Sequence, residues 1–199
     1  MRKILFVICM LGLLIVASCN NNKQTNSNGE KLDTVWNEKV QDTFYGLRLG
    51  DSLDVNTIVA TLESHGFWFN EECSSEDYLH FRSQKSQYFS FGGIVFEMLD
   101  IHRDNGILTR VDFMNSSKDK ASSLDDYEGI KNTVETKYSP TSIMPNDTTT
   151  YAKTCYFGKN NIGAKVACFR YESATYKICI GAMLSYYILN ISQAPNDEL

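Results

Sequence analysis

The sequence lacks most of the patterns that mark catalytic and nucleic-acid-binding proteins. It contains no G-x-S-x-G, H-E-x-x-H, P-loop or G-x-G-x-x-G motif. It has no C-x-x-C pair, which weakens a redox or zinc-ribbon interpretation. Lys and Arg form no cluster, so nucleic acid is not an expected partner. These absences make an enzyme less expected without excluding one, and no cofactor is expected.

Long apolar runs are also scarce, and the one that exists lies at the N-terminus. Arg2 and Lys3 precede the apolar run 4–16, which is shorter than the about 20 residues that a membrane-spanning helix needs. Small residues follow, in the order Val16-Ala17-Ser18-Cys19. A basic start, a short apolar core and small residues before a cut make up a secretory signal. Residues 1–18 are therefore predicted to be a signal peptide.

The cysteine directly after these small residues makes segment 16–19 resemble the lipobox of bacterial lipoproteins. The resemblance implies cleavage before Cys19 and attachment of a diacylglycerol and an acyl chain to that residue. Each buried methylene contributes about 0.8 kcal/mol, so several acyl chains together give stable membrane anchoring. An ordinary signal peptide cut near Ser18 is the alternative, and it would leave a soluble periplasmic protein.

Residues 19–41 begin with a polar, low-complexity stretch that has few large apolar side chains. Such a composition cannot offset the entropy of ordering, which predicts a flexible tether. In the lipoproteins that the signal resembles, Asp after the cysteine suggests inner-membrane retention and an acidic cluster suggests surface display. Asn20 and its neighbours show neither feature. We therefore expect a protein anchored in the outer membrane on its periplasmic side.

The remaining residues suit one domain, predicted to cover residues 42–191. The whole chain has a formal net charge of −5, and loss of Arg2 and Lys3 with the signal makes it −7. Four cysteines lie in this domain, and an exported protein meets oxidising conditions that permit disulfides. The three connectivities of Cys73, Cys155, Cys168 and Cys179 cannot be distinguished from sequence, and free thiols that pack as small apolar side chains are the alternative.

Apolar spacing predicts two helices among many strands. Val55, Ile58, Val59 and Leu62 follow helical periodicity after the candidate caps Asp51 and Ser52, with a stop at Gly66. A second helix is predicted over about 124–138, capped by Ser123 and stopped by Pro140. Strands are predicted at 42–50, 78–82, 88–91, 94–103, 107–114, 149–157, 162–171 and 175–189, with a turn at Asn105-Gly106.

These elements predict an α+β fold in which two helices pack on one face of a mostly antiparallel sheet. The order of one helix and about three strands occurs twice, in 42–117 and 118–191, which suggests two α-β-β-β repeats. Chance similarity between strand-rich segments is the alternative. The run 46–52 with the helix that follows and Gly66-Phe67 resembles small envelope lipoproteins. These include the small lipoprotein of the outer-membrane barrel-assembly machine and the tandem-repeat β-lactamase inhibitor protein. The resemblance implies a sheet whose uncovered face binds protein.

One polar group stands out along a predicted strand. Asp100, His102 and Asp104 alternate and so share a face of the sheet, as a metal site or an acid/base pair would require. Counting through the Asn-Gly turn places Ile107, Val111 and Phe113 opposite them and sends Arg110 and Asp112 to the other face with Glu97 and Arg103. The alternative, and the preferred interpretation, is the polar end of a half-covered hairpin. No metal is expected.

Aromatic residues are frequent in the predicted strands, and adjacent pairs such as Tyr88-Phe89 and Tyr186-Tyr187 point to opposite faces. Two helices cannot cover both faces, so we expect a protein or peptide partner to bind an aromatic sheet face. Aromatic rings that pack against one another are the alternative. A small periplasmic hydrolase or metal-dependent enzyme and a carrier of hydrophobic ligands are the other two hypotheses.

Overall fold

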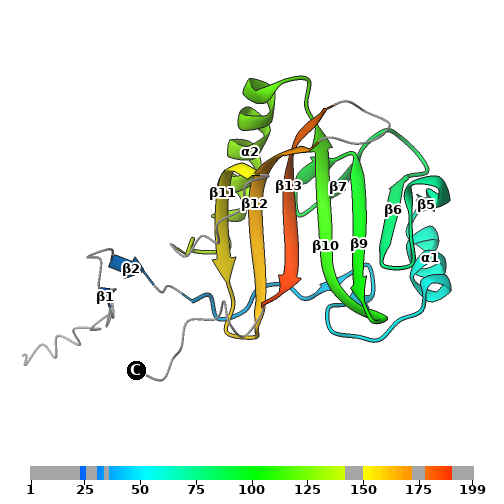
Figure 1. Ribbon diagram of the computed structural model, residues 1–199, viewed down its shortest axis with the longest axis horizontal. Coiled ribbons are helices and arrows are strands. Elements are labelled where there is room, and N and C mark those ends of the chain that lie inside the picture. The colour runs from blue at the N-terminus through cyan, green and yellow to red at the C-terminus, as the bar shows by residue number, and fades with distance from the viewer. Residues whose placement is uncertain (1–22, 26–30, 34–35, 142–149, 172–177, 190–199) are drawn as a thin grey trace, which may run out of the picture.

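The computed structural model describes residues 23–25, 31–33, 36–141, 150–171 and 178–189 (Figure 1). Its centre is a seven-stranded sheet in the order β11-β12-β13-β10-β9-β6-β5, in which all paired neighbours are antiparallel. With two α-helices in the described residues, this confirms an α+β fold with a mostly antiparallel sheet. The strands are β5 Phe67–Phe69, β6 Tyr78–Ser83, β9 Met98–Asp104, β10 Ile107–Ser116, β11 Thr150–Phe157, β12 Ile162–Tyr171 and β13 Cys179–Ile188.

The first predicted helix is confirmed as α1, Val55–Ser64. Its cap is Asp54, whose carboxylate accepts a 2.8 Å hydrogen bond from the Thr57 backbone N–H, and neither Asp51 nor Ser52 takes this role. Ile58 and Leu62 are buried. Beyond the helix, Gly66 adopts a φ of 88°, a conformation that favours glycine and ends helices.

The second helix begins and ends earlier than predicted, as α2, Lys120–Val134. Asp119 caps it, because its carboxylate accepts a 2.8 Å hydrogen bond from the Ser122 backbone N–H. Ser123 lies inside the helix, where its hydroxyl donates to the Gly181 carbonyl of β13. The predicted Ser123 cap is therefore wrong, and Val134 ends the helix well before Pro140 could stop it.

The Asn105-Gly106 turn between β9 and β10 is confirmed, with φ of 51° and 79° at its two residues. Two predicted single strands are divided instead. Segment 42–50 folds into the hairpin β3 Thr43–Phe44 and β4 Leu47–Arg48, turning at Tyr45 and Gly46, which both have positive φ. Segment 94–103 splits into β9 and β8 Ile94–Phe96, and β8 pairs with β7 Phe89–Phe91 outside the main sheet.

The ordered fold begins before residue 42, inside the predicted tether. Val40 is fully buried, and Asn37 forms a bridge to Gly158 and accepts and donates hydrogen bonds at Ser139. Two short strands, β1 Lys23–Thr25 and β2 Lys31–Asp33, pair still earlier in the chain. The apolar side chains of Trp36 and Val40 explain why this segment joins the fold, since both contact an apolar cluster.

The main core lies against one face of the sheet and is rich in aromatic rings. Phe113 of β10 stacks on Phe91 of β7 with ring centroids 4.0 Å apart. The ring of Phe44 of β3 lies 6.0 Å from the Phe113 ring. In Figure 1, α2 lies over the end of the sheet that holds β11, β12 and β13, and α1 lies at the β5 end. Both helices contribute buried residues to this core, which the 3-10 turn η1, Glu71–Cys73, does not enter.

Candidate functional site

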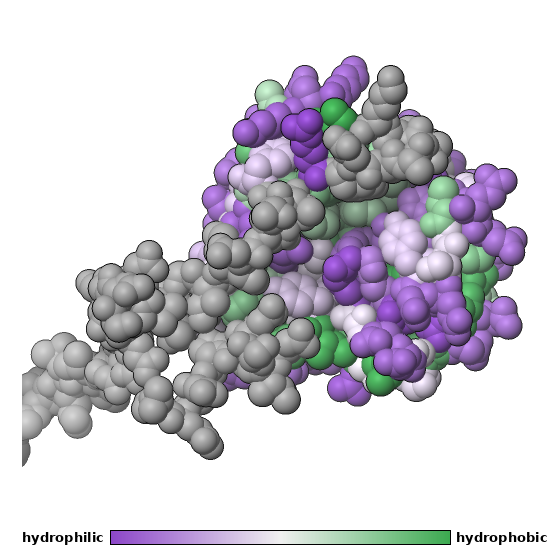
Figure 2. All heavy atoms as spheres, in the orientation of Figure 1, coloured by the Kyte–Doolittle hydropathy of each residue, from purple (hydrophilic) through white to green (hydrophobic). Residues whose placement is uncertain are grey.

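The face of the sheet opposite the main core carries a cluster of polar side chains. Leu99 and Ile101 of β9 lie in the core, so the alternate residues of that strand project to the opposite side. We call this opposite side the polar face. Its residues discussed below are Trp68, Tyr78, His80, Arg82, Met98, Asp100, His102, Arg110, Asp112, Met114, Met183, Ser185 and Tyr187. Figure 2 shows hydrophilic residues gathered where β10, β9, β6 and β5 lie in Figure 1.

A bulge in β10 decides which side chains meet on this face. The register shifts between Leu108 and Arg110, so that His102 pairs with Arg110 and Asp100 with Asp112. Val111 pairs with Ile101 on the core side instead. Ile107 pairs with Asp104 as predicted, but the prediction that Val111 and Phe113 lie opposite Asp100 and His102 is wrong. A bulge adds one residue to one strand and moves every later side chain to the other face.

Asp100 lies at the centre of the first half of the cluster. The residue is 2% exposed, and its two side-chain oxygens accept hydrogen bonds from separate donors. The Tyr78 hydroxyl donates to Oδ2 at 2.6 Å, and His80 Nδ1 lies 2.7 Å from Oδ1. Because a carboxylate is an acceptor, the hydrogen on His80 is assigned to Nδ1. The other ring nitrogen, Nε2, makes no hydrogen bond within the described residues.

Asp112 organises the second half in the same way. His102 Nε2 lies 2.9 Å from its Oδ2, and Arg110 Nε forms an ion pair with the same oxygen at 3.0 Å. Burial acts to raise the pKa of Asp112, but the hydrogen bond from His102 and the charges of Arg110 and His102 outweigh it. The pKa therefore lies below its usual value. An edge-on contact between the Tyr78 and His102 rings, 5.1 Å apart, joins the two halves.

Two buried oxygens of the cluster remain without normal hydrogen-bond geometry. Among the described residues, neither Asp112 Oδ1 nor Ser185 Oγ has a hydrogen-bond partner at normal distance and angle. The two residues pair directly across β10 and β13, and the Ser185 hydroxyl also helps to lower the pKa of Asp112. Buried polar atoms without partners are uncommon in folded proteins, so this is the point at which the polar layer is incompletely hydrogen-bonded.

The three residues singled out from the sequence are not brought together. Asp100 binds His80, His102 binds Asp112, and Asp104 is exposed at the hairpin tip, where its carboxylate accepts from Asn105. Across the described ranges, no three His, Cys, Asp or Glu side chains gather as a metal site would require. His80 Nε2 could accept a proton as a general base.

Sequence reasoning missed Tyr78, His80, Arg110 and Asp112 as members of one cluster. The alternation of polar residues in Tyr78-x-His80 and Arg110-x-Asp112 was a usable signal, because such residues share a face of their strand. It could not reveal that the two pairs lie on the same face, since that depends on the bulge.

All four cysteines of the domain are free thiols. Cys73 is exposed in η1, whereas Cys155 and Cys168 are buried in different apolar surroundings. Burial raises the pKa of both buried thiols. For Cys155 and Cys168, the structure thus agrees with the alternative of free thiols that pack as small apolar side chains.

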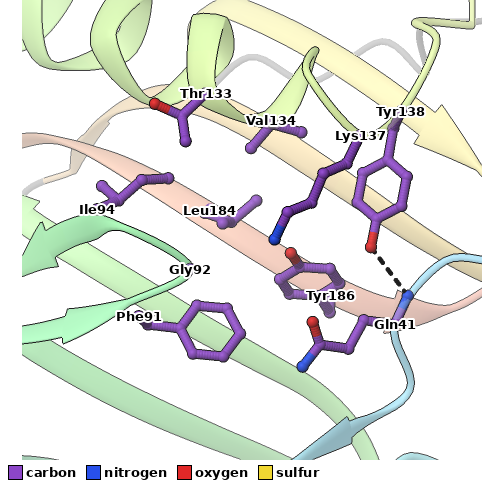
Figure 3. A pocket seen from close by; sticks show the side chains of 10 residues that line it. All are labelled: Gln41, Phe91, Gly92, Ile94, Thr133, Val134, Lys137, Tyr138, Leu184 and Tyr186. Carbon is purple, nitrogen blue, oxygen red and sulfur yellow. Dashed lines mark hydrogen bonds between the residues drawn. The ribbon is translucent and has the colours of Figure 1, made fainter.

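A small pocket opens between α2, the β7–β8 hairpin and the segment before β3 (Figure 3). Phe91 and Leu184 line it together with the polar ends of Lys137 and Tyr186, and the Gln41 backbone N–H donates to the Tyr138 hydroxyl at 3.2 Å. The space holds little more than one water molecule, so this pocket does not support a carrier of lipid-sized ligands.

Most aromatic residues of the predicted strands pack inside the protein, and only some of them lie on the polar face. Phe81, Phe89, Phe91, Tyr156 and Tyr186 belong to or contact the main core. Phe157 and Tyr187 lie with Trp36 in a second, smaller apolar cluster, and Phe169 is buried. Tyr78 and Tyr187 project from the polar face, joined by Trp68, which is 41% exposed. Tyr176 lies outside the described residues.

Neither helix that the structure describes is long and apolar enough to cross a membrane. Comparisons of the chain with protein families, with curated proteins and with solved structures found no match.

Proposed function

We propose that this chain is a non-catalytic lipoprotein of the outer membrane that binds a protein or peptide partner through its polar face. The observation that carries the proposal is that this face combines exposed interface-type side chains with buried, hydrogen-bonded carboxylates. Trp68, Tyr78, Arg82 and Met98 are exposed or partly exposed there, beside the buried, hydrogen-bonded pairs of Asp100 and Asp112. Trp, Tyr, Met and Arg are the residues enriched in protein interfaces, and a fixed polar layer holds them in place.

The proposal includes an architecture in which both helices cover the core side and leave the polar face to the partner. It also takes 42–117 and 118–191 as two α-β-β-β halves. In support, the strand order β6-β9-β10 is followed by β13-β12-β11, so the last strand of each half meets the other at the centre. A sheet built in this way offers one continuous surface, as expected from the envelope lipoproteins that segment 46–52 resembles.

The anchor is tested by a Cys19→Ser substitution. We expect the variant to move from the detergent phase to the aqueous phase and to be released by carbonate wash, because it can no longer carry acyl chains. Phase partitioning followed by immunoblotting measures this change, with Cys73→Ser as the control that retains the anchor. Partitioning of Cys19→Ser with detergent would contradict lipid attachment at this residue.

Partner binding is tested with exposed residues, so that the fold is left intact. Trp68→Ser combined with Arg82→Glu is expected to reduce capture of the partner at least about tenfold, as loss of central interface residues does. The matched control combines Tyr88→Ser with Lys85→Glu, which changes an exposed aromatic and an exposed cation beside β7. Equal capture by the two double variants, at equal melting temperature, would reject the polar face as the binding surface.

A hydrolytic enzyme is the second candidate, and the 2.7 Å contact of His80 with Asp100 favours it. A carboxylate on Nδ1 fixes the ring tautomer and leaves Nε2 as a base, which is one element of general base catalysis. In the described part of the chain, no nucleophilic side chain is hydrogen-bonded to the His80 ring, although Ser74 Oγ accepts from the His80 backbone N–H at 2.9 Å. A pH-dependent hydrolytic activity that is lost in His80→Gln would favour this candidate over a binding protein.

A further inference from the structure

Every methionine in the described part of the chain lies in one row across the polar face. Met98, Met114 and Met183 come from β9, β10 and β13, which are neighbours in the sheet. Met98 pairs directly with Met114, and Met114 pairs directly with Met183. Directly opposite residues in antiparallel strands have Cβ atoms about 4.5–5.5 Å apart. Three flexible thioether side chains therefore stand side by side on one surface.

Ordinary core packing does not explain this row. None of the three methionines belongs to either apolar cluster of the described residues, which are filled by aliphatic and aromatic side chains. Met114 is 9% exposed, and Met98 and Met183 are partly exposed, so their sulfur atoms are not sealed in the interior. Ala167 pairs with Met183 on the next strand, and its small side chain leaves room beside the row.

The charges beside the row come from two buried carboxylates and two arginines. Asp100 and Asp112 lie two residues from Met98 and Met114 on the same strands and face, and Asp112 is paired with Arg110. Arg82 pairs with Met98 at one end of the row, but its side chain is exposed and can extend into solvent. The carboxylates offset these arginines, so binding of a metal ion at the row depends on the thioether ligands and not on a net negative potential.

We propose that Met98, Met114 and Met183 form a binding site for a soft monovalent metal ion, copper(I), for which silver(I) is a redox-inert substitute. Thioether sulfur is a soft ligand that suits copper(I) and disfavours hard ions such as calcium and magnesium. The site rests on strand register and does not depend on the proposed partner binding. It uses no cysteine, so the thiols of the domain play no part in it.

The test follows the methionine methyl groups directly. The chain from residue 20 onward keeps every described residue, and Cys73→Ser with Cys179→Ser removes the accessible thiols that would compete for silver(I). With carbon-13 in the methionine methyl groups, silver(I) is expected to shift the signals of Met98, Met114 and Met183 and to saturate at an equimolar amount. The signal of Met144, which lies outside the described residues, serves as the internal reference.

Substitution by leucine removes the sulfur with little change in volume, so the fold is expected to survive. Met114→Leu, the central position, is expected to weaken silver(I) binding by about tenfold or more and to reduce the shifts at the other two methyl groups. If that variant fails to fold, Met183→Leu at the partly exposed end gives the same test. No shift at a several-fold excess of silver(I), or an equal shift at Met144, would overturn the site.

Discussion

Replacing Phe113 by alanine is expected to lower the free energy of unfolding by about 3–5 kcal/mol, the usual cost of removing a buried phenylalanine ring. Phe113 is fully buried at the centre of the aromatic core. Its ring stacks on Phe91 at 4.0 Å and lies 5.5 Å from Phe96 and 6.3 Å from Tyr186. The substitution would leave a cavity bordered by rigid rings, which cannot collapse easily to fill it.

Urea unfolding followed by circular dichroism measures this loss. Val95→Ala is the control, because Val95 is 54% exposed on β8 of the same layer and should change stability by less than about 0.5 kcal/mol. If Phe113→Ala unfolded at the same urea concentration as the control, the aromatic core would not have the position assigned to it.

The second large effect is expected from Asp112→Ala, which should destabilise the protein by about 1.5–3 kcal/mol at neutral pH, the usual range for hydrogen bonds to a charged group. Asp112 is 3% exposed and holds both His102 and Arg110. Its removal leaves a guanidinium group against the sheet without its counter-charge. Because water reaches the Arg110 side chain, which is 41% exposed, the cost is smaller than the about 3–5 kcal/mol of a fully buried ion pair that loses one partner.

The stabilising effect of Asp112 is expected to depend on pH. The pKa of folded Asp112 lies below its usual value, so its charged form stabilises the folded state above the pKa of the unfolded chain. That stability is lost as the pH falls through the folded pKa. The free energy of unfolding should therefore differ most between the wild type and Asp112→Ala at pH 7, and this difference should decrease below about pH 4.

Urea unfolding at a series of pH values measures how the difference in unfolding free energy decreases with pH. Asp104→Ala is the control, because Asp104 is an exposed carboxylate on the same hairpin and should cost less than about 0.5 kcal/mol. If the difference in unfolding free energy between the wild type and Asp112→Ala stayed constant from pH 7 to pH 3, the charged, paired state of Asp112 would be contradicted.

Local signals in the sequence predicted those elements whose stability is local. Helix α1 was found from the spacing of Ile58 and Leu62, and the β9–β10 turn was found from Asn105-Gly106, which tolerates positive φ. Both signals act within a few residues. The cap of α2 was misplaced because Asp119 and Ser123 are both good capping residues, and contact of Ser123 with the Gly181 carbonyl places it inside the helix.

Elements that depend on distant partners were not predictable in this way. β5 forms because Phe67–Phe69 pairs with β6. β8 is separate from β9 because it pairs with β7 outside the main sheet. The largest error came from the bulge between Leu108 and Arg110, which has no strong residue signature. One extra residue placed Arg110 and Asp112 beside His102 and Asp100, at the positions predicted for Val111 and Phe113.

Photo-crosslinking in the native envelope tests the proposed function most directly. A photoreactive residue at position 68 or 82 of the polar face is compared with the same residue at position 88, which is also exposed. Our account predicts a discrete covalent adduct with an envelope protein or peptide from positions 68 and 82, and none from position 88. Absence of an adduct from both polar-face positions, or the same adduct from position 88, would contradict it.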